Sequence, residues 1–183
     1  RLTMAAPKRE LLLLRHGIAQ ERNAAIDDAQ RSLTPAGRER TRAQLKALVA
    51  LGLHCDLVLS SPLVRARQTA ELVVDVGLGE TLELAAALAP HANPLPLLTS
   101  WLGPLSPRSS WRRLALVGHE PDLTSLAARL IGVPNDLAPQ ALHLKKAGAL
   151  LLQWPMPVQQ ELLGSARLEL LLPPRVLLGQ HRP

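Results

Sequence analysis

Short apolar runs alternate with longer amphipathic segments over about the first 130 residues of the chain. Each run ends abruptly in polar or turn-forming residues, which is typical of buried strands. The segments between the runs carry apolar residues with a period of three to four, as helices do. The pattern predicts strands over residues 10–15, 56–60, 81–84 and 113–118, and helices over residues 35–51, 62–76 and 121–131.

The last of these helices carries an apolar stripe that is wide enough to pack on a sheet. The stripe follows the spacing i, i+3, i+4, i+7, i+8 and consists of Leu123, Leu126, Ala127, Leu130 and Ile131. Strands that alternate with such helices form parallel sheets covered on both faces. We therefore expect an α/β fold of three layers, α/β/α, with a mostly parallel central sheet and helices on both faces.

The pattern changes after Pro134. Two apolar segments, 147–153 and 166–172, predict an antiparallel extension at one edge of the sheet. Lys145 and Lys146 precede the first of them, where a solvated sheet edge is the simplest interpretation and steering of phosphate the alternative. A proline-rich stretch over 90–107 predicts one short helix (94–103) and forms the expected wall of the mouth of a site.

The composition fits one globular domain. The chain has 183 residues, of which 47% are hydrophobic, enough for a sizeable core. We assign residues 9–183 to this domain and residues 1–8 to an N-terminal tail. With three Trp and no Phe or Tyr, the core must be built from Leu, Val and Ala, and we expect Trp101 and Trp111 to pack in it.

The charge and the cysteine content limit which partners and which cellular compartment we expect. The net charge of +6 suits an anionic partner, yet much of the excess lies on the helix segment 38–46, where it forms a solvated face. Few aromatic residues are present to stack on bases, so we expect no nucleic-acid partner. Cys55 is the single cysteine and suits a reducing cytosol. No run approaches the ~20 apolar residues of a membrane span, and we expect a cytoplasmic protein, most simply a monomer.

The first candidate for chemistry is Arg15-His16-Gly17, at the end of the uncharged run Leu11–Leu14. A buried strand that stops here delivers a cation and an imidazole to a turn. The glycine allows the backbone to bend tightly or to approach a ligand. Taken alone, the tripeptide fits a surface arginine at a strand end equally well.

Two later segments repeat this arrangement. The first is a strand followed by Ser61-Pro62, which predicts a helix with Ser61 as N-cap and Pro62 at the first helical position. Arg65 then lies in the first turns of that helix, near free N–H groups that favour anions. In the second segment a strand ends at His119 and a helix begins at Pro121. Ligands of open α/β sheets bind at the carboxyl ends of strands, so the three segments should meet there.

These motifs resemble those of the histidine phosphatase superfamily (branch 1), and more narrowly the small phosphohistidine phosphatases of the SixA type. The resemblance covers about residues 10–131 and rests on Arg15-His16-Gly17, Leu33-Thr34-Pro35-Ala36-Gly37, the run from Ser61 to Ala70, and Val117-Gly118-His119-Glu120-Pro121. It implies a phosphoglycerate mutase-like fold and a phosphatase that needs neither metal nor cofactor.

The resemblance also implies a role for each matched residue. His16 would be the nucleophile and would form a phosphohistidine intermediate. Arg15 and Arg65 would bind the phosphoryl oxygens, since a guanidinium fork matches phosphate geometry. His119 would donate a hydrogen bond to the phosphoryl group. The partner would be a protein carrying phosphohistidine or a small phosphorylated metabolite.

The chain departs from larger members of the superfamily, which place a general-acid glutamate just after the third strand. No Asp or Glu occurs from Leu84 through His119, and the matching position, near Ala87, offers no proton. An alkoxide leaving group needs a proton, whereas imidazole, with a pKa near 6.5, leaves without one. The absence therefore favours a P–N substrate. The alternative acids are His91 and, in the loop after the first motif, Glu21, Asp27 and Asp28.

Two other functions remain open at this stage. One is a phosphatase acting on a small phosphomonoester; a mutase is less favoured because the compact chain has little room for a second phosphorylated ligand. The other is a non-catalytic module that binds phosphorylated partners through the same pocket.

Overall fold

A computed structural model describes residues 8–103, 106, 110–158 and 161–179. The strands are β1 (Lys8–Arg15), β2 (Leu57–Ser60), β3 (Leu82–Leu84), β4 (Arg113–Gly118), β5 (Ala149–Pro155) and β6 (Arg167–Leu172). The helices are α1 (Pro35–Ala50), α2 (Val64–Asp75), α3 (Leu95–Leu102), α4 (Asp122–Ile131), α5 (Ala138–Ala141) and α6 (Pro174–Leu177), and the 3-10 turns are η1 (Asp28–Gln30) and η2 (Ala86–Leu88).

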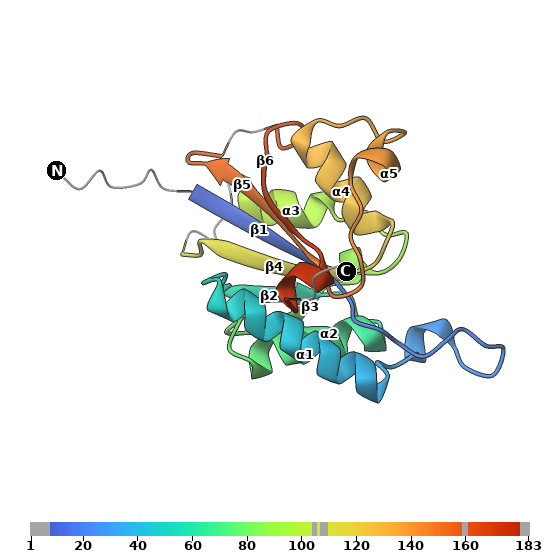
Figure 1. The fold of residues 1–183 in the computed structure, drawn as a ribbon. Coiled ribbons are helices and arrows are strands. Elements are labelled where there is room, and N and C mark those ends of the chain that lie inside the picture. The colour runs from blue at the N-terminus through green and yellow to red at the C-terminus, as the bar shows by residue number, and fades with distance from the viewer. Residues whose placement is uncertain (1–7, 104–105, 107–109, 159–160, 180–183) are drawn as a thin grey trace.

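The six strands form one sheet in the order β3-β2-β4-β1-β5-β6 (Figure 1). The first four of these are parallel, while β5 pairs with β1 in antiparallel fashion and β6 pairs with β5 in the same way. This confirms the predicted parallel sheet and its antiparallel extension. β4 lies between β1 and β2, although it follows both in the chain.

Alternating residues of β1 serve two separate hydrophobic cores, one on each face of the sheet. Leu11 and Leu13 pack with α3 and α4, whereas Leu12 and Leu14 pack with α1 and α2. Figure 1 shows the two pairs of helices on opposite sides of the strands. The molecule therefore has the three predicted layers, and leucines dominate both cores.

Local signals explain where the first helix begins. Pro35 occupies its first turn, and the hydroxyl of the N-cap residue Thr34 accepts a hydrogen bond from the Gly37 amide at 2.9 Å. Both tryptophans of the proline-rich stretch, Trp101 and Trp111, are buried, as predicted.

Some predicted boundaries were wrong by a few residues. α2 begins at Val64 with Leu63 as its N-cap and no side-chain cap, so Ser61 is not the cap and Pro62 precedes the helix. α4 begins one residue after Pro121. β1 includes Lys8; the rest of the predicted tail, residues 1–7, lies outside the described residues.

Cys55 is buried beside the start of β2, where burial raises the pKa of its thiol to about 12, as fits a packing role. Over the ranges that the structure describes, no helix has the length and apolar character needed to cross a membrane.

Candidate active site

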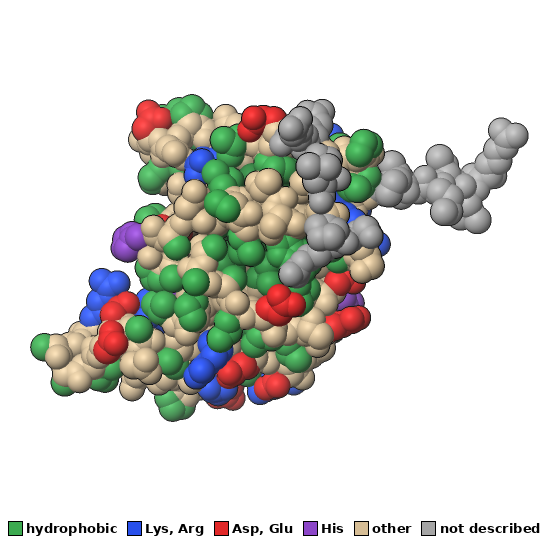
Figure 2. Space-filling view, turned by 180° about the vertical axis from the view of Figure 1, so that it is seen from behind, with side chains coloured by type: hydrophobic (Ala, Val, Ile, Leu, Met, Phe, Trp, Pro, Cys, Tyr) green, Lys and Arg blue, Asp and Glu red, His purple; other side chains and the backbone are tan. Residues whose placement is uncertain are grey.

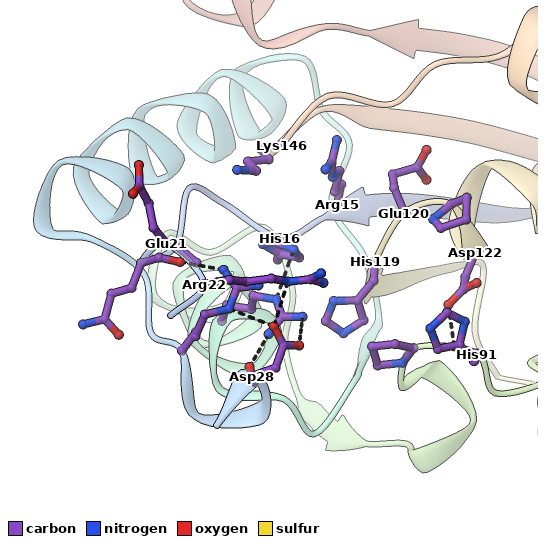
Figure 3. Close-up of a pocket in the computed structure, with 16 residues that line it drawn as sticks. Arg15, His16, Glu21, Arg22, Asp28, His91, His119, Glu120, Asp122 and Lys146 are labelled. Atoms are coloured by element: carbon purple, nitrogen blue, oxygen red, sulfur yellow. Dashed lines mark hydrogen bonds and ion pairs between the residues drawn. The ribbon is translucent and has the colours of Figure 1, made fainter. Parts of the chain in front are cut away.

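The three sequence segments meet at the carboxyl ends of adjacent parallel strands, as predicted. Backbone hydrogen bonds hold the strand ends together: the His16 amide donates to the Gly118 carbonyl at 3.1 Å, and the Ser61 amide donates to the Val117 carbonyl at 3.0 Å. The side chains beyond these strand ends line a cavity of about 700 Å³. Figure 3 shows them converging on its centre from several elements.

His16 lies in the cavity wall and is only 7% exposed. Its Nδ1 is 2.7 Å from the Gly17 carbonyl oxygen, which can only accept a hydrogen bond, so Nδ1 carries the proton. Its Nε2 accepts a hydrogen bond from Arg65 Nε at 3.3 Å and therefore holds a lone pair. Burial lowers the pKa of His16 to about 3, with neighbouring cationic groups adding to the effect. The ring is thus neutral near pH 7, as a nucleophile must be.

Gly17 fixes this geometry through tight packing. A Cβ at this position would lie 2.1 Å from Thr41 Oγ1, so any larger residue would collide with helix α1. The Gly17 amide donates to Thr69 Oγ1 at 3.0 Å, and that hydroxyl donates to the Arg65 carbonyl at 2.8 Å. His16 and helix α2, which carries Arg65, are therefore linked through the backbone of Gly17.

Arg65 is buried at the start of α2 and is held by the loop that follows β1. It donates from one terminal nitrogen to the Asp28 carbonyl at 2.7 Å and from the other to Asp28 Oδ2 at 3.1 Å. Oδ1 of Asp28 also pairs with Arg22 at 3.1 Å and Arg31 at 2.9 Å. One carboxylate thus holds three guanidinium groups at the edge of the cavity.

The loop that supplies these groups projects from the body between β1 and α1 (Figure 1). Blue and red side chains lie together where it leaves the body, whereas its tip is mostly uncharged (Figure 2). Its base is closed by a bridge between Ala19 and Leu33, and the Leu33 amide donates to Gln68 Oε1 of α2 at 2.8 Å.

His119 lies beside His16, with ring centroids 5.2 Å apart and planes tilted by 54°. Its Nε2 contacts Ser61 Oγ at 2.7 Å, and the same hydroxyl accepts the Leu63 amide at 3.3 Å, so Ser61 orients the His119 ring just before α2 begins. Burial, with Arg65 nearby, lowers the pKa of His119 to about 4.

Two buried polar atoms at the cavity have no hydrogen-bond partner within the described part of the chain: His119 Nδ1 and Arg15 Nε. Arg15 is otherwise oriented by a hydrogen bond from its NH1 to the Leu144 carbonyl at 3.0 Å. Burying unpaired polar atoms is unfavourable, and functional sites are one place where proteins retain them. Both atoms are donors or potential donors of the kind that phosphate oxygens accept.

The structure also places the alternative acids. His91 and Glu21 line the cavity, as do two carboxylates that the sequence did not single out, Glu120 and Asp122. Asp27 is not among the lining residues; its carboxylate accepts the Ala29 amide at 3.1 Å within the loop.

Most of these carboxylates are already engaged. Burial would raise the pKa of Asp28, but the guanidinium groups of Arg65 and Arg31 outweigh it and lower that pKa. Asp28 is therefore held ionised and is a poor proton donor. Glu120 accepts the Thr124 amide at 2.9 Å.

Asp122 accepts the His91 amide at 2.8 Å, which holds the His91 backbone at a positive φ of 66°. Ala87, the position matching the superfamily glutamate, lies in η2 and outside the cavity lining. Across the described ranges, no group of three or more His, Cys, Asp or Glu side chains is placed to hold a metal ion.

Sequence reasoning missed Arg22 and Arg31 as cavity-lining cations, and it gave steering of phosphate by Lys146, which also lines the cavity, only as an alternative. Arg22 and Arg31 carry no motif, and only the fold of the loop brings them back to the strand ends. Lys146 was noted at the start of β5, but its place beside Arg15 depends on the antiparallel return of that strand.

Comparisons with known proteins agree with this geometry. Residues 11–89 match the sequence model of the Histidine phosphatase superfamily (branch 1). An uncharacterized protein of Picosynechococcus sp. is 38% identical over 144 residues, which span 76% of this chain and 81% of that protein.

Two solved structures share the fold. The protein histidine phosphatase SixA complexed with tungstate has a TM-score of 0.72 at 23% identity, covering 90% of this chain and 97% of the other. The alpha-ribazole phosphatase from Shigella flexneri has a TM-score of 0.64 at 21% identity, covering 90% and 96%.

Proposed function

The chain belongs to the histidine phosphatase superfamily (branch 1), and on that premise we propose that it is a metal-independent phosphatase that removes phosphate from phosphohistidine in a protein. The observation that carries this proposal is the state of His16: a buried, neutral imidazole with a lone pair on Nε2, beside Arg65 and His119. A group so arranged is suited to attack phosphorus.

In the first step, His16 Nε2 forms a bond to phosphorus as the bond from phosphorus to the substrate nitrogen breaks. That nitrogen keeps the electron pair of the broken bond, and the substrate ring leaves as neutral imidazole because its other nitrogen is protonated in the reacting form. The proton on His16 Nδ1 stays in its hydrogen bond to Gly17, which stabilises the positive charge that develops on the ring. Arg65 Nε–H, which donates to Nε2 in the free enzyme, transfers its hydrogen bond to a phosphoryl oxygen. Arg15 and His119 bind the remaining oxygens with their unpaired nitrogens.

In the second step, water attacks the phosphorus of phospho-His16 and releases inorganic phosphate, which restores the neutral ring. The three donors of Arg65, Arg15 and His119 around the transferring group lower the barrier mainly by positioning and electrostatic stabilisation. No redox or metal-bound species is required by this scheme.

A P–N substrate and a P–O substrate differ in what their leaving groups require. Asp28 is ionised by its arginines, and Glu120 and Asp122 each accept a backbone amide, so none of them is a ready proton source. Imidazole leaves readily because its conjugate acid has a pKa near 6.5. With Asp28, Glu120 and Asp122 engaged in this way, the site suits phosphohistidine better than an alkyl phosphate.

A second function, hydrolysis of a small phosphomonoester, is favoured by one observation. His91 lines the cavity and is exposed, so its ring could protonate an alkoxide. To separate the two functions, we would measure kcat/KM on phenyl phosphates of graded acidity for wild type, His91→Ala and the exposed control His143→Ala. The proposal expects a steep dependence on leaving-group pKa in all three. A flat wild-type dependence that becomes steep only in His91→Ala would make His91 the acid.

Phosphate labelling of the protein separates an enzyme from a non-catalytic module that only binds phosphorylated partners. An enzyme of the proposed kind incorporates acid-labile, base-stable phosphate at His16 and turns it over on a phosphohistidine peptide. His16→Ala should lose both labelling and turnover. If wild type binds the peptide but never becomes labelled, the catalytic proposal is wrong.

A further inference from the structure

A strongly basic groove adjoins the cavity that contains His16, which we refer to as the phosphate cavity. The groove has a volume of about 430 Å³ and is lined by Arg15, Ile18, Arg40, Lys145, Lys146, Pro174 and Arg175. We refer to it as the basic groove. Arg15 and Lys146 line both the groove and the phosphate cavity, so the two hollows are adjacent.

Four separate segments bring cations to this groove. Arg15 comes from the end of β1, Arg40 from α1, Lys145 and Lys146 from the turn before β5, and Arg175 from α6. Within the described residues, the groove lining includes no acidic side chain. Lys145, Lys146 and Arg175 are exposed and form no ion pair with another described residue. Positive charges gathered in a concave surface focus a field that attracts anions.

Acidic side chains of the phosphate cavity lie on the other side of Arg15. Figure 3 shows Glu120, Asp122 and His91 there, whereas Lys146 lies on the side of Glu21. An acidic chain that enters the cavity would be repelled by Glu120 and Asp122 and attracted past Lys146. Arg15 and Lys146, which line both hollows, therefore offer such a chain a positively charged route from the cavity toward the basic groove.

We propose that the basic groove binds acidic side chains that flank the phosphorylated residue of a protein substrate, an inference that rests on the proposed phosphatase function. Several features favour an acidic polypeptide over a nucleic acid. The groove offers no aromatic side chain on which a base could stack; its apolar contacts are Ile18 and Pro174. Its position next to the phosphate cavity, with Arg15 and Lys146 in both linings, suits one chain that reaches both.

The test compares two phosphohistidine peptides that differ only in having Glu or Gln at the flanking positions. Wild type should prefer the Glu peptide by about five- to tenfold in kcat/KM, mostly through KM, and salt should weaken the preference, since the contacts are exposed ion pairs. The groove variant Arg40→Gln/Lys145→Gln/Arg175→Gln should lose the preference while retaining turnover of the Gln peptide and of a small aryl phosphate.

A matched control carries the same change in net charge elsewhere. The variant Lys46→Gln/Arg112→Gln/Arg167→Gln removes three exposed cations that line neither hollow. It should keep the wild-type preference, which separates a local groove from general attraction to a basic protein. Equal loss in both variants would overturn the proposal, as would equal turnover of the two peptides by wild type.

Direct binding keeps the inference separate from the catalytic proposal. A fluorescent, unphosphorylated Glu-rich peptide should bind wild type about five- to tenfold more tightly than the groove variant, whether or not the enzyme turns over phosphohistidine. If turnover of phosphohistidine is absent but the groove variant still binds the Glu-rich peptide more weakly than wild type, the proposed function is wrong and the inference about the groove is supported. Tighter binding of a single-stranded oligonucleotide than of the Glu-rich peptide would refute an acidic polypeptide as the occupant.

Discussion

Acidification should destabilise this protein through His16 and His119, because both rings are buried and neutral in the folded state. In the unfolded chain each imidazole takes up a proton as the pH falls below about 6.5. In the folded protein that uptake is delayed until the pH approaches about 3 for His16 and about 4 for His119. Stability is thus complete above the unfolded pKa and is lost progressively as the pH falls toward the folded values.

The size of the loss follows from the difference between the pKa of the unfolded imidazole and the pH of the measurement, as long as the pH stays above the folded pKa. At about pH 5, roughly 1.5 pH units below the unfolded pKa, each ring costs about 2 kcal/mol, since one unit is worth about 1.4 kcal/mol. The two rings together should lower the free energy of unfolding by about 4 kcal/mol relative to about pH 7.5. At this pH the result is insensitive to the folded pKa values, provided that they lie near or below 4.

Urea denaturation at about pH 7.5 and pH 5, in phosphate-free buffer, would measure the loss. Carboxylates also contribute, but their contribution cancels when wild type is compared with His16→Gln and His119→Gln. Each variant should show a pH-dependent loss smaller than that of wild type by about 2 kcal/mol. His143→Gln is the control, because its ring is exposed in the folded protein as well. A loss in His16→Gln or His119→Gln as large as in wild type would refute the reasoning.

Three further predictions follow from the contacts of the site. Arg15→Ala should weaken vanadate binding about 10- to 100-fold by isothermal titration calorimetry, the cost of losing a charge-assisted hydrogen bond of about 1.5–3 kcal/mol; unchanged affinity would remove Arg15 from the anion site. Asp28→Asn should lower the free energy of unfolding by about 1 kcal/mol in the absence of anions, and Tm with it, since this carboxylate is partly exposed. Vanadate should then raise Tm more than in wild type, because Arg65 lacks its counter-charge; an equal rise in both proteins would argue against Asp28 as the counter-charge of Arg65. Gly17→Ala should cost about 1–3 kcal/mol in urea denaturation through its collision with the Thr41 hydroxyl, and adding Thr41→Ala should recover part of it, whereas strictly additive losses would exclude the collision.

The parts of the site that the sequence revealed are those encoded by neighbouring residues. Arg15-His16-Gly17 and His119 stand directly after apolar runs, so their place at strand ends follows from periodicity alone. The N-terminal boundary of α1 was equally accessible, because Thr34-Pro35 combines a capping hydroxyl with the proline that favours a first turn.

The parts that the sequence did not reveal depend on contacts between distant residues. Asp28 meets Arg65 across 37 positions, and nothing in its local pattern distinguishes it from a solvated loop carboxylate. Ser61 has the pattern of a helix cap, but its hydroxyl lies beside His119, 58 positions further along the chain, and the helix begins later. Local propensity was overridden here by tertiary contacts at the site itself.

The strand order has a consequence for how the protein is made. β1 ends next to His16, and β2 ends shortly before the helix that carries Arg65, yet the two strands are not neighbours. β4 separates them and is synthesised more than fifty residues after β2. A nascent chain that has emerged only as far as α2 therefore carries His16 and Arg65 without a backbone ladder to hold them in register. Non-local pairing of this kind slows folding, because the entropy of closing the intervening loop is lost before the strand contacts contribute any stabilisation. Catalytic competence should consequently appear late and abruptly during translation, when β4 enters between the two strands.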